Sequence, residues 1–278
     1  MAIPNVAHFV WGLKQEPEPF HLVHYLCIES CRRVQRPDRI ILHCRHLPYG
    51  RYWQLLEPHV TLAPADLVPE VSAAAYDEGL VPESYRYAHH SDFVRLDALI
   101  ETGGIYADID TLFVRPFPPE LCAARFVIGR EDDVRDELTG AVRPSLCNAL
   151  LMSEPRSLFA VMWRRTAAGA LNGTWSNHST LLPHELSERL PDAVRVEPRG
   201  SFYEYGPNRE DLARLFEQAG SAPAGVYSIH LWAHLWWAEE RRDFSPMHAG
   251  LLDETFVREV DTTYNVLARE FLPGLDGP

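Results

Sequence analysis

The sequence predicts an α/β fold in which a mostly parallel, Rossmann-like sheet is flanked by helices. In the first half of the chain, short apolar runs alternate with longer amphipathic stretches, which is typical of a parallel sheet covered by helices on both faces. The 278 residues suit one large domain, which at this length buries about 75% of its unfolded surface. We therefore expect residues 1–278 to form a single domain, with a helical extension at about 234–278.

Apolar runs bounded by turn-forming residues predict the strands, and helical periodicity predicts the helices. We expect strands at residues 3–11, 38–43, 60–62, 105–110, 124–129, 146–152, 193–197 and 225–230. We expect helices at residues 20–34, 88–102, 157–171, 179–190 and 253–271, with a short helical turn at 49–58. Residues 63–83 are rich in alanine, proline and glutamate and predict a loop or lid-like insertion, and the charged segment 131–142 predicts a surface loop.

The rest of the chain is organised around residues 88–116. The predicted helix at 88–102 carries an acid and a base, Asp92 and Arg95, on a stripe that is otherwise mostly apolar. Charges on a buried stripe must be paired or hydrogen-bonded, because their desolvation alone costs several kcal/mol. Since the two residues are three apart, a local ion pair is the structural alternative to a binding role.

A glycine pair, Gly103 and Gly104, ends this helix, and the strand that follows carries two carboxylates. Alternation along that strand predicts that Tyr106, Asp108 and Asp110 share one face. Two neighbouring carboxylates repel each other unless a cation lies between them, which predicts a site for Mn²⁺ or Mg²⁺. By itself an Asp-x-Asp motif is weak evidence, since a solvated strand end explains most such motifs.

The order of these features resembles the DXD sugar-binding glycosyltransferases, namely glycosyltransferase family 32 and its relatives, which include the catalytic domains of large glucosylating toxins. Their pattern is Ser-Asp-x-x-Arg, a short helix, then Gly-Gly-x-Tyr-x-Asp-x-Asp. It stands in this chain as Ser91, Asp92, Arg95, Gly103, Gly104, Tyr106, Asp108 and Asp110. The family's Ile-Pro-x-x-Ile-His-x-x-Trp start is matched by Ile3, Pro4, His8 and Trp11. The resemblance extends to about Trp232 and implies a GT-A fold.

The resemblance also implies roles for individual residues. It implies that Trp11 stacks on the nucleotide base and that Asn148, on a predicted strand, faces the donor sugar. The alternatives are a core tryptophan and an asparagine bonded to a neighbouring loop. It further implies that His230 completes the metal site with Asp108 and Asp110. Trp232 fits the family's His-x-Trp spacing near that point and is expected to contact the donor.

The implied reaction is transfer of a sugar from a nucleotide diphosphate donor, UDP- or GDP-linked, with retention of the anomeric configuration. We expect the metal to stabilise the charge that grows on the departing phosphate. Asp92 would accept hydrogen bonds from sugar hydroxyls, Arg95 would bind sugar and phosphate oxygens, and Tyr106 would pack on the sugar. The acceptor stays open between a glycan, a peptide and a small natural product. Two alternatives also stay open, an inactive nucleotide-sugar-binding protein and a nucleotidyltransferase, although the latter usually needs a catalytic lysine.

Composition excludes other classes of partner. The formal net charge is −13, which argues against nucleic acid or an anionic membrane surface as the main partner. Lys14 is the single lysine among 26 lysine and arginine residues, so most mechanisms that need a catalytic lysine are excluded. No apolar run approaches the ~20 residues of a membrane span, and no signal peptide is visible. The five cysteines favour free thiols over a disulfide framework, so we expect a cytoplasmic enzyme.

Overall fold

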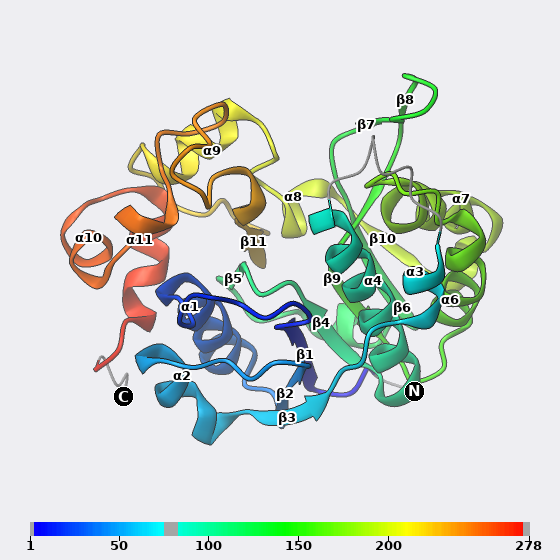
Figure 1. The fold of residues 1–278 in the computed structure, drawn as a ribbon, viewed down its shortest axis with the longest axis horizontal. Coiled ribbons are helices and arrows are strands. Elements are labelled where there is room, and N and C mark those ends of the chain that lie inside the picture. The colour runs from blue at the N-terminus through cyan, green and yellow to red at the C-terminus, as the bar shows by residue number, and fades with distance from the viewer. Residues whose placement is uncertain (1–2, 75–82, 275–278) are drawn as a thin grey trace.

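The computed structural model describes residues 3–74 and 83–274, and its centre is a mixed sheet (Figure 1). The sheet has seven strands in the order β10-β6-β9-β4-β1-β2-β3. Its strands are β1 (Val6–Trp11), β2 (Arg39–Cys44), β3 (Thr61–Pro64), β4 (Gly104–Ala107), β6 (Phe126–Arg130), β9 (Leu146–Ser153) and β10 (Arg195–Glu197). Two small pairs are also present: β5 (Thr111–Phe113) with β11 (Ser228–His230), and β7 (Val134–Arg135) with β8 (Val142–Arg143).

Most of the neighbouring strands in the central sheet are parallel. The pairs β1–β2, β1–β4, β2–β3 and β6–β10 are parallel, whereas β9 is antiparallel to both β4 and β6. This topology confirms the predicted Rossmann-like α/β class with a mostly parallel sheet. Because the carboxyl ends of neighbouring parallel strands lie together, the residues that follow β1 and β4 lie at the same end of the sheet.

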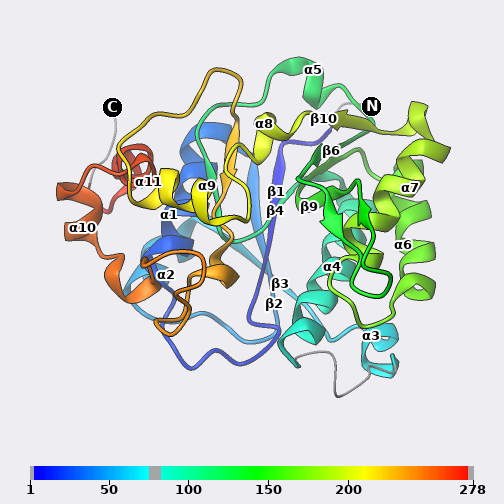
Figure 2. The same ribbon diagram turned by 90° about the horizontal axis from the view of Figure 1, so that it is seen from above.

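Helices cover both faces of the sheet (Figures 1 and 2). They are α1 (Leu22–Ser30), α2 (Arg51–Leu56), α3 (Pro69–Ala73), α4 (Glu83–Thr102), α5 (Pro119–Cys122), α6 (Leu158–Ala170), α7 (Leu182–Arg189), α8 (Arg199–Phe202), α9 (Arg209–Phe216), α10 (Glu254–Glu259) and α11 (Thr263–Ala268). The apolar core has a cluster on each face. On one face of the sheet, α1 packs against β1. On the other face, α4, α6 and α7 pack against β4, β6 and β9.

Several predicted elements differ from the observed ones. The predicted strand at residues 105–110 ends at Ala107, so Asp108 and Asp110 lie in a turn. The predicted surface loop at 131–142 contains most of the β7–β8 hairpin. The predicted helix at 253–271 is divided into α10, α11 and the 3₁₀ turn Arg269–Phe271, and the side chains of Asp253 and Thr262 cap the starts of the two α-helices. Of the predicted lid-like insertion at 63–83, residues 75–82 lie outside the described part of the chain.

The C-terminal elements pack on the N-terminal half. The apolar cluster that contains Phe9 and Leu26 also contains Tyr264 and Phe271, which come from the predicted extension. This shared core supports our proposal that residues 1–278 form one domain, although residues 275–278 of that extension are outside the described range. Among the described helices, none is both long enough and apolar enough to cross a membrane.

Candidate active site

The Asp-x-Asp motif is presented by two tight turns. Gly103 and Gly104 have positive φ angles of 67° and 117°, and a Cβ atom on Gly104 would collide with the carbonyl oxygen of Val6. Glycine is therefore required where α4 turns into β4. After β4, the Asp108 carbonyl accepts a hydrogen bond from the Thr111 amide at 3.0 Å, which closes the second turn. Our expectation that Tyr106, Asp108 and Asp110 share a strand face is wrong, because the strand has already ended.

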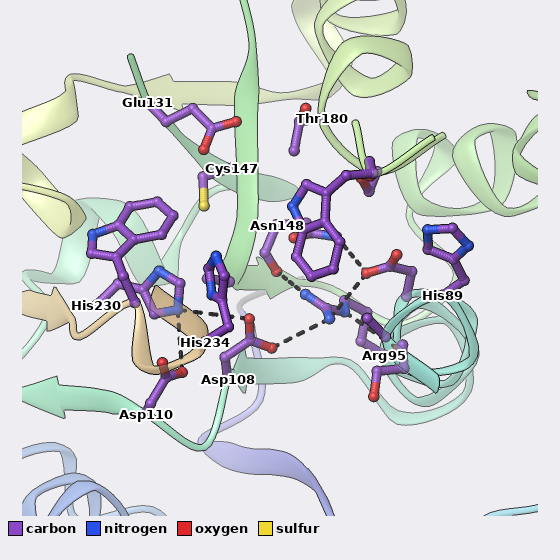
Figure 3. Close-up of a pocket in the computed structure, with 17 residues that line it drawn as sticks. His89, Arg95, Asp108, Asp110, Glu131, Cys147, Asn148, Thr180, His230 and His234 are labelled. Carbon is purple, nitrogen blue, oxygen red and sulfur yellow. Dashed lines mark hydrogen bonds and ion pairs between the residues drawn. The ribbon is translucent and has the colours of Figure 1, made fainter. Parts of the chain in front are cut away.

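His230 meets both carboxylates from a strand far along the chain. β11 is antiparallel to β5, and this register places His230 opposite Thr111, next to the motif. Its Nε2 atom lies 3.2 Å from Oδ1 of Asp110 and 3.9 Å from Oδ2 of Asp108. One possible ligand atom from each of the three residues lies within 4.8 Å of the other two. Figure 3 shows the three side chains pointing toward one another.

The electrostatics of this cluster match a cation site. Burial would raise the pKa of Asp110, but the His230 ring and the Ala233 amide outweigh it and hold that pKa well below its usual range. Burial would lower the pKa of His230, and the two carboxylates outweigh it, so that pKa is raised. Two carboxylates and an imidazole nitrogen are a donor set that suits a divalent cation. The residues present therefore fit the predicted Mn²⁺ or Mg²⁺.

Trp232 holds the segment beside His230 in a strained conformation. Its φ angle is +54°, which is costly for a bulky residue. The indole donates to the Tyr205 carbonyl at 2.8 Å, and the next amide, that of Ala233, donates to Oδ2 of Asp110 at 2.8 Å. The strained residue thus directs a backbone donor at the predicted metal ligand, and its ring centroid lies 4.2 Å from that of His230.

Asp92 and Arg95 form an ion pair inside a larger network. Arg95 Nη2 lies 3.0 Å from Oδ1 of Asp92 and 3.3 Å from Oδ1 of Asp108. Arg95 also donates to the Asn148 carbonyl at 2.7 Å, and the Asn148 amide donates to Asp92 at 2.7 Å. Arg95 is only 4% exposed, and its guanidinium nitrogens are used mainly by protein oxygens. The pair that we weighed as the structural alternative therefore exists, and both of its members also line a cavity.

A break in strand pairing creates part of this network. The register between β6 and β9 jumps from Ile128–Leu151 to Gly129–Cys147, a bulge that contains Asn148 and Ala149. The carbonyl oxygen of Asn148 accepts from Arg95, and that of Ala149 accepts from the Asp108 amide at 2.7 Å. Bulges are frequent beside active sites because they redirect backbone and side-chain groups.

Two predicted donor contacts lie elsewhere. Tyr106 is 1% exposed and does not line the cavity; its hydroxyl donates to Asp108 at 2.6 Å, and Arg95 lies 4.6 Å above its ring. Tyr106 is therefore placed to hold Asp108 and Arg95 in position and not to pack on a sugar. Trp11 lies outside the central cavity, at the end of β1. It is half-buried, with its ring centroid 4.9 Å from those of Phe20 and His24.

The residues around the motif enclose a central cavity of about 250 Å³ (Figure 3). Its lining comprises Ala88, His89, Ser91, Asp92, Arg95, Asp108, Asp110, Glu131, Cys147, Asn148, Ala149, Trp175, Ser179, Thr180, His230, Trp232 and His234. A second cavity, here called the Trp11 cavity, is lined by Trp11, Lys14, Glu16, Pro17, Glu18, Pro19, His24, Ala233, His234 and Trp237. Among the described residues, His234 is the one lining residue that these two cavities share.

The sequence did not reveal several residues of this site. Glu131 points into the central cavity, and its Oε1 atom has no hydrogen-bond partner within the described chain. Burial raises the pKa of Glu131 to about 7. His178 is 1% exposed and its Nε2 atom donates to Oδ2 of Asp92 at 2.9 Å. Glu131 lies within a charged run that is typical of a surface loop, and His178 belongs to none of the motifs described above. The sequence therefore did not indicate that either residue lies at the site.

Comparison with known proteins agrees with this geometry. Residues 60–128, which include all four charged residues of the motif, match the family described as glycosyltransferase sugar-binding region containing DXD motif. Over 281 residues the chain is 29% identical to glucan organizing enzyme 1 of Cryptococcus neoformans var. grubii serotype A, covering 98% of this chain and 71% of the relative. These matches confirm the predicted resemblance and the predicted class of enzyme.

Solved structures also resemble the chain, at lower identity. One described as PaToxG glycosyltransferase is 18% identical, covers 68% of this chain and 71% of its own, and has a TM-score of 0.43. Another, 4-diphosphocytidyl-2C-methyl-D-erythritol synthase of Anaerococcus prevotii, is 16% identical, covers 69% of this chain and 86% of its own, and has a TM-score of 0.36.

Proposed function

This chain is a glycosyltransferase with a DXD sugar-binding region, and from that premise we propose that it transfers a sugar from a nucleotide diphosphate donor, with retention, in a metal-dependent reaction. The observation that carries the proposal is the shared cavity. The Asp108–Asp110–His230 cluster and the Asp92–Arg95 network line one space, joined by Asp108. A nucleotide sugar carries a diphosphate next to a sugar ring with several hydroxyls. A metal site beside groups that can bind hydroxyls matches both parts of such a donor.

In this proposal Asp108, Asp110 and His230 hold the cation. An imidazole in the donor set leads us to prefer Mn²⁺ to Mg²⁺, which usually takes oxygen ligands alone. The bound ion supplies Lewis-acid stabilisation for the charge that builds on the departing phosphate. The Ala233 amide keeps Asp110 in place, and Tyr106 does the same for Asp108.

Asp92 is proposed to bind the donor sugar. Its two oxygens accept three hydrogen bonds or ion-pair contacts, from Arg95, Asn148 and His178. A carboxylate offers about four lone-pair sites, so one remains for a sugar hydroxyl. Since the fork of Arg95 is occupied by protein oxygens, we propose that Arg95 positions the two acids and that Asn148 fixes Asp92.

The nucleoside is proposed to bind in the Trp11 cavity. Trp11, His24 and Trp237 give this cavity an aromatic lining, and the His24 and Trp237 rings are stacked at 4.9 Å. A UDP- or GDP-sugar would then extend from this cavity, past His234, to the metal site and the central cavity. We infer that the departing phosphate oxygen takes the acceptor's proton as the acceptor oxygen bonds the anomeric carbon, which is consistent with retention.

Two alternatives keep their predicted rank below the transferase. A nucleotidyltransferase usually needs a catalytic lysine, and Lys14 lines the Trp11 cavity and not the central one. An inactive nucleotide-sugar-binding protein would be expected to have lost part of the charged constellation. A cytoplasmic location is proposed from the odd number of cysteines, five.

The experiment that tests this function incubates the protein with a panel of UDP- and GDP-sugars and Mn²⁺. Released nucleoside diphosphate is measured with and without chelator, and the anomeric configuration of any product is read by NMR. Because one relative is named a glucan organizing enzyme, carbohydrate acceptors are tested first, followed by peptides and small natural products. Release from one donor that stops with chelator supports the proposal, and binding of nucleotide sugars without any release favours the inactive alternative.

A further inference from the structure

A third cavity opens beside the central one, and it is here called the outer cavity. It has a volume of about 510 Å³ and is lined by Ala88, Glu137, Trp175, His234, Leu235, Arg241 and Phe244. Three of these residues, Ala88, Trp175 and His234, also line the central cavity. The two spaces are therefore adjacent, and the ring centroids of Trp175 and His234 lie 5.4 Å apart in the wall that they have in common.

The outer cavity lies at the sugar end of the proposed donor site. Ala88 is four residues before Asp92 and seven before Arg95 on α4, so the three lie on one face of that helix. His234 lines all three cavities, whereas Ala88 and Trp175 line the outer and central cavities and not the Trp11 cavity that is proposed for the nucleoside. An acceptor in the outer cavity would thus approach the donor from the side of its sugar, where the new bond must form.

The lining combines flat apolar rings with fixed hydrogen-bonding groups. Arg241 donates to the His234 carbonyl at 3.0 Å and pairs with Asp243 at 3.0 Å, which holds its guanidinium 5.6 Å from the ring centroid of Phe244. Glu137, on the β7–β8 hairpin, accepts from the Trp175 amide at 2.8 Å. Ligand sites typically combine aromatic walls with a few oriented polar groups.

We propose that the outer cavity binds the acceptor and that the acceptor is a carbohydrate. A sugar ring has an apolar C–H face that fits against Trp175 or Phe244, and hydroxyls that match Glu137 and Arg241. A lipid chain would desolvate the Glu137 carboxylate and the Arg241–Asp243 pair without offering either of them a hydrogen bond. In the reaction, an acceptor hydroxyl oxygen bonds the anomeric carbon, the bond to the phosphate oxygen breaks with its electrons, and the hydroxyl proton leaves on the diphosphate. This inference rests on the proposed function.

The test measures saccharide binding by saturation-transfer NMR with Mg²⁺ and nucleoside diphosphate present. The probes are the neutral trisaccharides maltotriose, laminaritriose, cellotriose and mannotriose, with a serine-containing hexapeptide in parallel. We expect at least one trisaccharide to bind, and Phe244→Ala and Glu137→Gln each to weaken it at least fivefold. The matched control is Leu138→Ala, which removes a side chain that is 67% exposed on the same hairpin and lines neither cavity. Glu137→Gln keeps the test valid if Phe244→Ala does not fold.

The outcomes separate this inference from the proposed function. Nucleoside diphosphate affinity should stay within twofold of wild type in all three variants. If no trisaccharide binds, if only the peptide binds, or if saccharide binding survives both cavity substitutions, the inference is overturned, while the proposed function stands as long as the diphosphate binds. If wild-type protein with metal binds neither nucleoside diphosphate nor nucleotide sugar, the proposed function itself fails.

Discussion

The Nε2 atom of His230 lies 3.2 Å from Oδ1 of Asp110, although 120 residues separate them in the sequence. The pairing of β11 with β5 produces this contact, because it sets His230 opposite Thr111. The second oxygen of Asp110 is held by the Ala233 amide, so one oxygen is fixed by the last residue of β11 and the other by the segment that follows it. The metal site therefore depends on the C-terminal half of the chain as much as on the motif.

Asp92→Asn should reduce sugar transfer at least about tenfold while nucleoside diphosphate affinity stays within about twofold, because Asp92 is proposed to contact the sugar and not the phosphates. Unfolding should also become easier by about 1–3 kcal/mol, since buried donors of Arg95 and His178 lose a charged partner. Transfer rate, calorimetric affinity and melting temperature measure the three effects. Asp97→Asn is the matched control on the same helix, at a side chain 52% exposed. If the melting temperature of Asp92→Asn falls steeply while the protein that remains folded transfers sugar at the normal rate, the Asp92–Arg95 pair is structural.

Trp11→Ala should weaken nucleoside diphosphate binding by about 1–3 kcal/mol, which is on the order of 5- to 150-fold, because the base loses its stacking partner. Isothermal titration calorimetry with UDP and GDP in the presence of metal measures the change. Leu55→Ala, at a side chain 42% exposed on α2, is the control and should bind as wild type does. An unchanged affinity in folded Trp11→Ala would mean that Trp11 has a packing role and does not stack on the base.

How far the sequence predicts the site depends on how local each contact is. Asp92, Arg95, Asp108 and Asp110 lie within one helix–turn–strand unit, so their order along the chain was sufficient to group them. His230 was found only through its family spacing, because its position depends on strand pairing far from the motif. The resemblance implied that Tyr106 packs on the sugar, but Tyr106 lies within β4 with its ring buried against Arg95 and its hydroxyl hydrogen-bonded to Asp108.

Glu131 and His178 could not be predicted, for physical reasons. The local sequence of Glu131 is charged and typical of a surface, whereas the cavity that its side chain lines is completed by residues far along the chain, such as Cys147 and His230. His178 reaches Asp92 from a π-helical turn, Asn177–Leu181, and no periodicity marks such a turn. Fold class was easier to predict, because alternating strand and helix patterns determine it over long stretches.

Glu131→Gln should change stability in a pH-dependent way. Burial raises the pKa of Glu131 from 4.5 to about 7, so the folded protein binds this proton more tightly than the unfolded chain. That contribution is fully present below pH 4.5 and is lost as the pH rises through 7. Glutamine cannot ionise, so the variant should melt at a higher temperature than wild type at pH 8 and lose this advantage at pH 4. Exposed Glu188→Gln is the control, and an equal shift at both pH values would contradict the assignment.

The most direct test of the metal-centred mechanism is a Mn²⁺ titration of nucleoside diphosphate release from the donor sugar, for wild type and Asp110→Asn. Asparagine keeps the shape and an acceptor for the Ala233 amide, while it removes the charge that the cation needs. Wild-type release should rise with Mn²⁺ and stop with chelator. Asp110→Asn should be slower by about 100-fold or more without loss of melting temperature, and Asp261→Asn, at a side chain 68% exposed, should match wild type. Full release in the presence of chelator, or full activity in Asp110→Asn, would contradict the account.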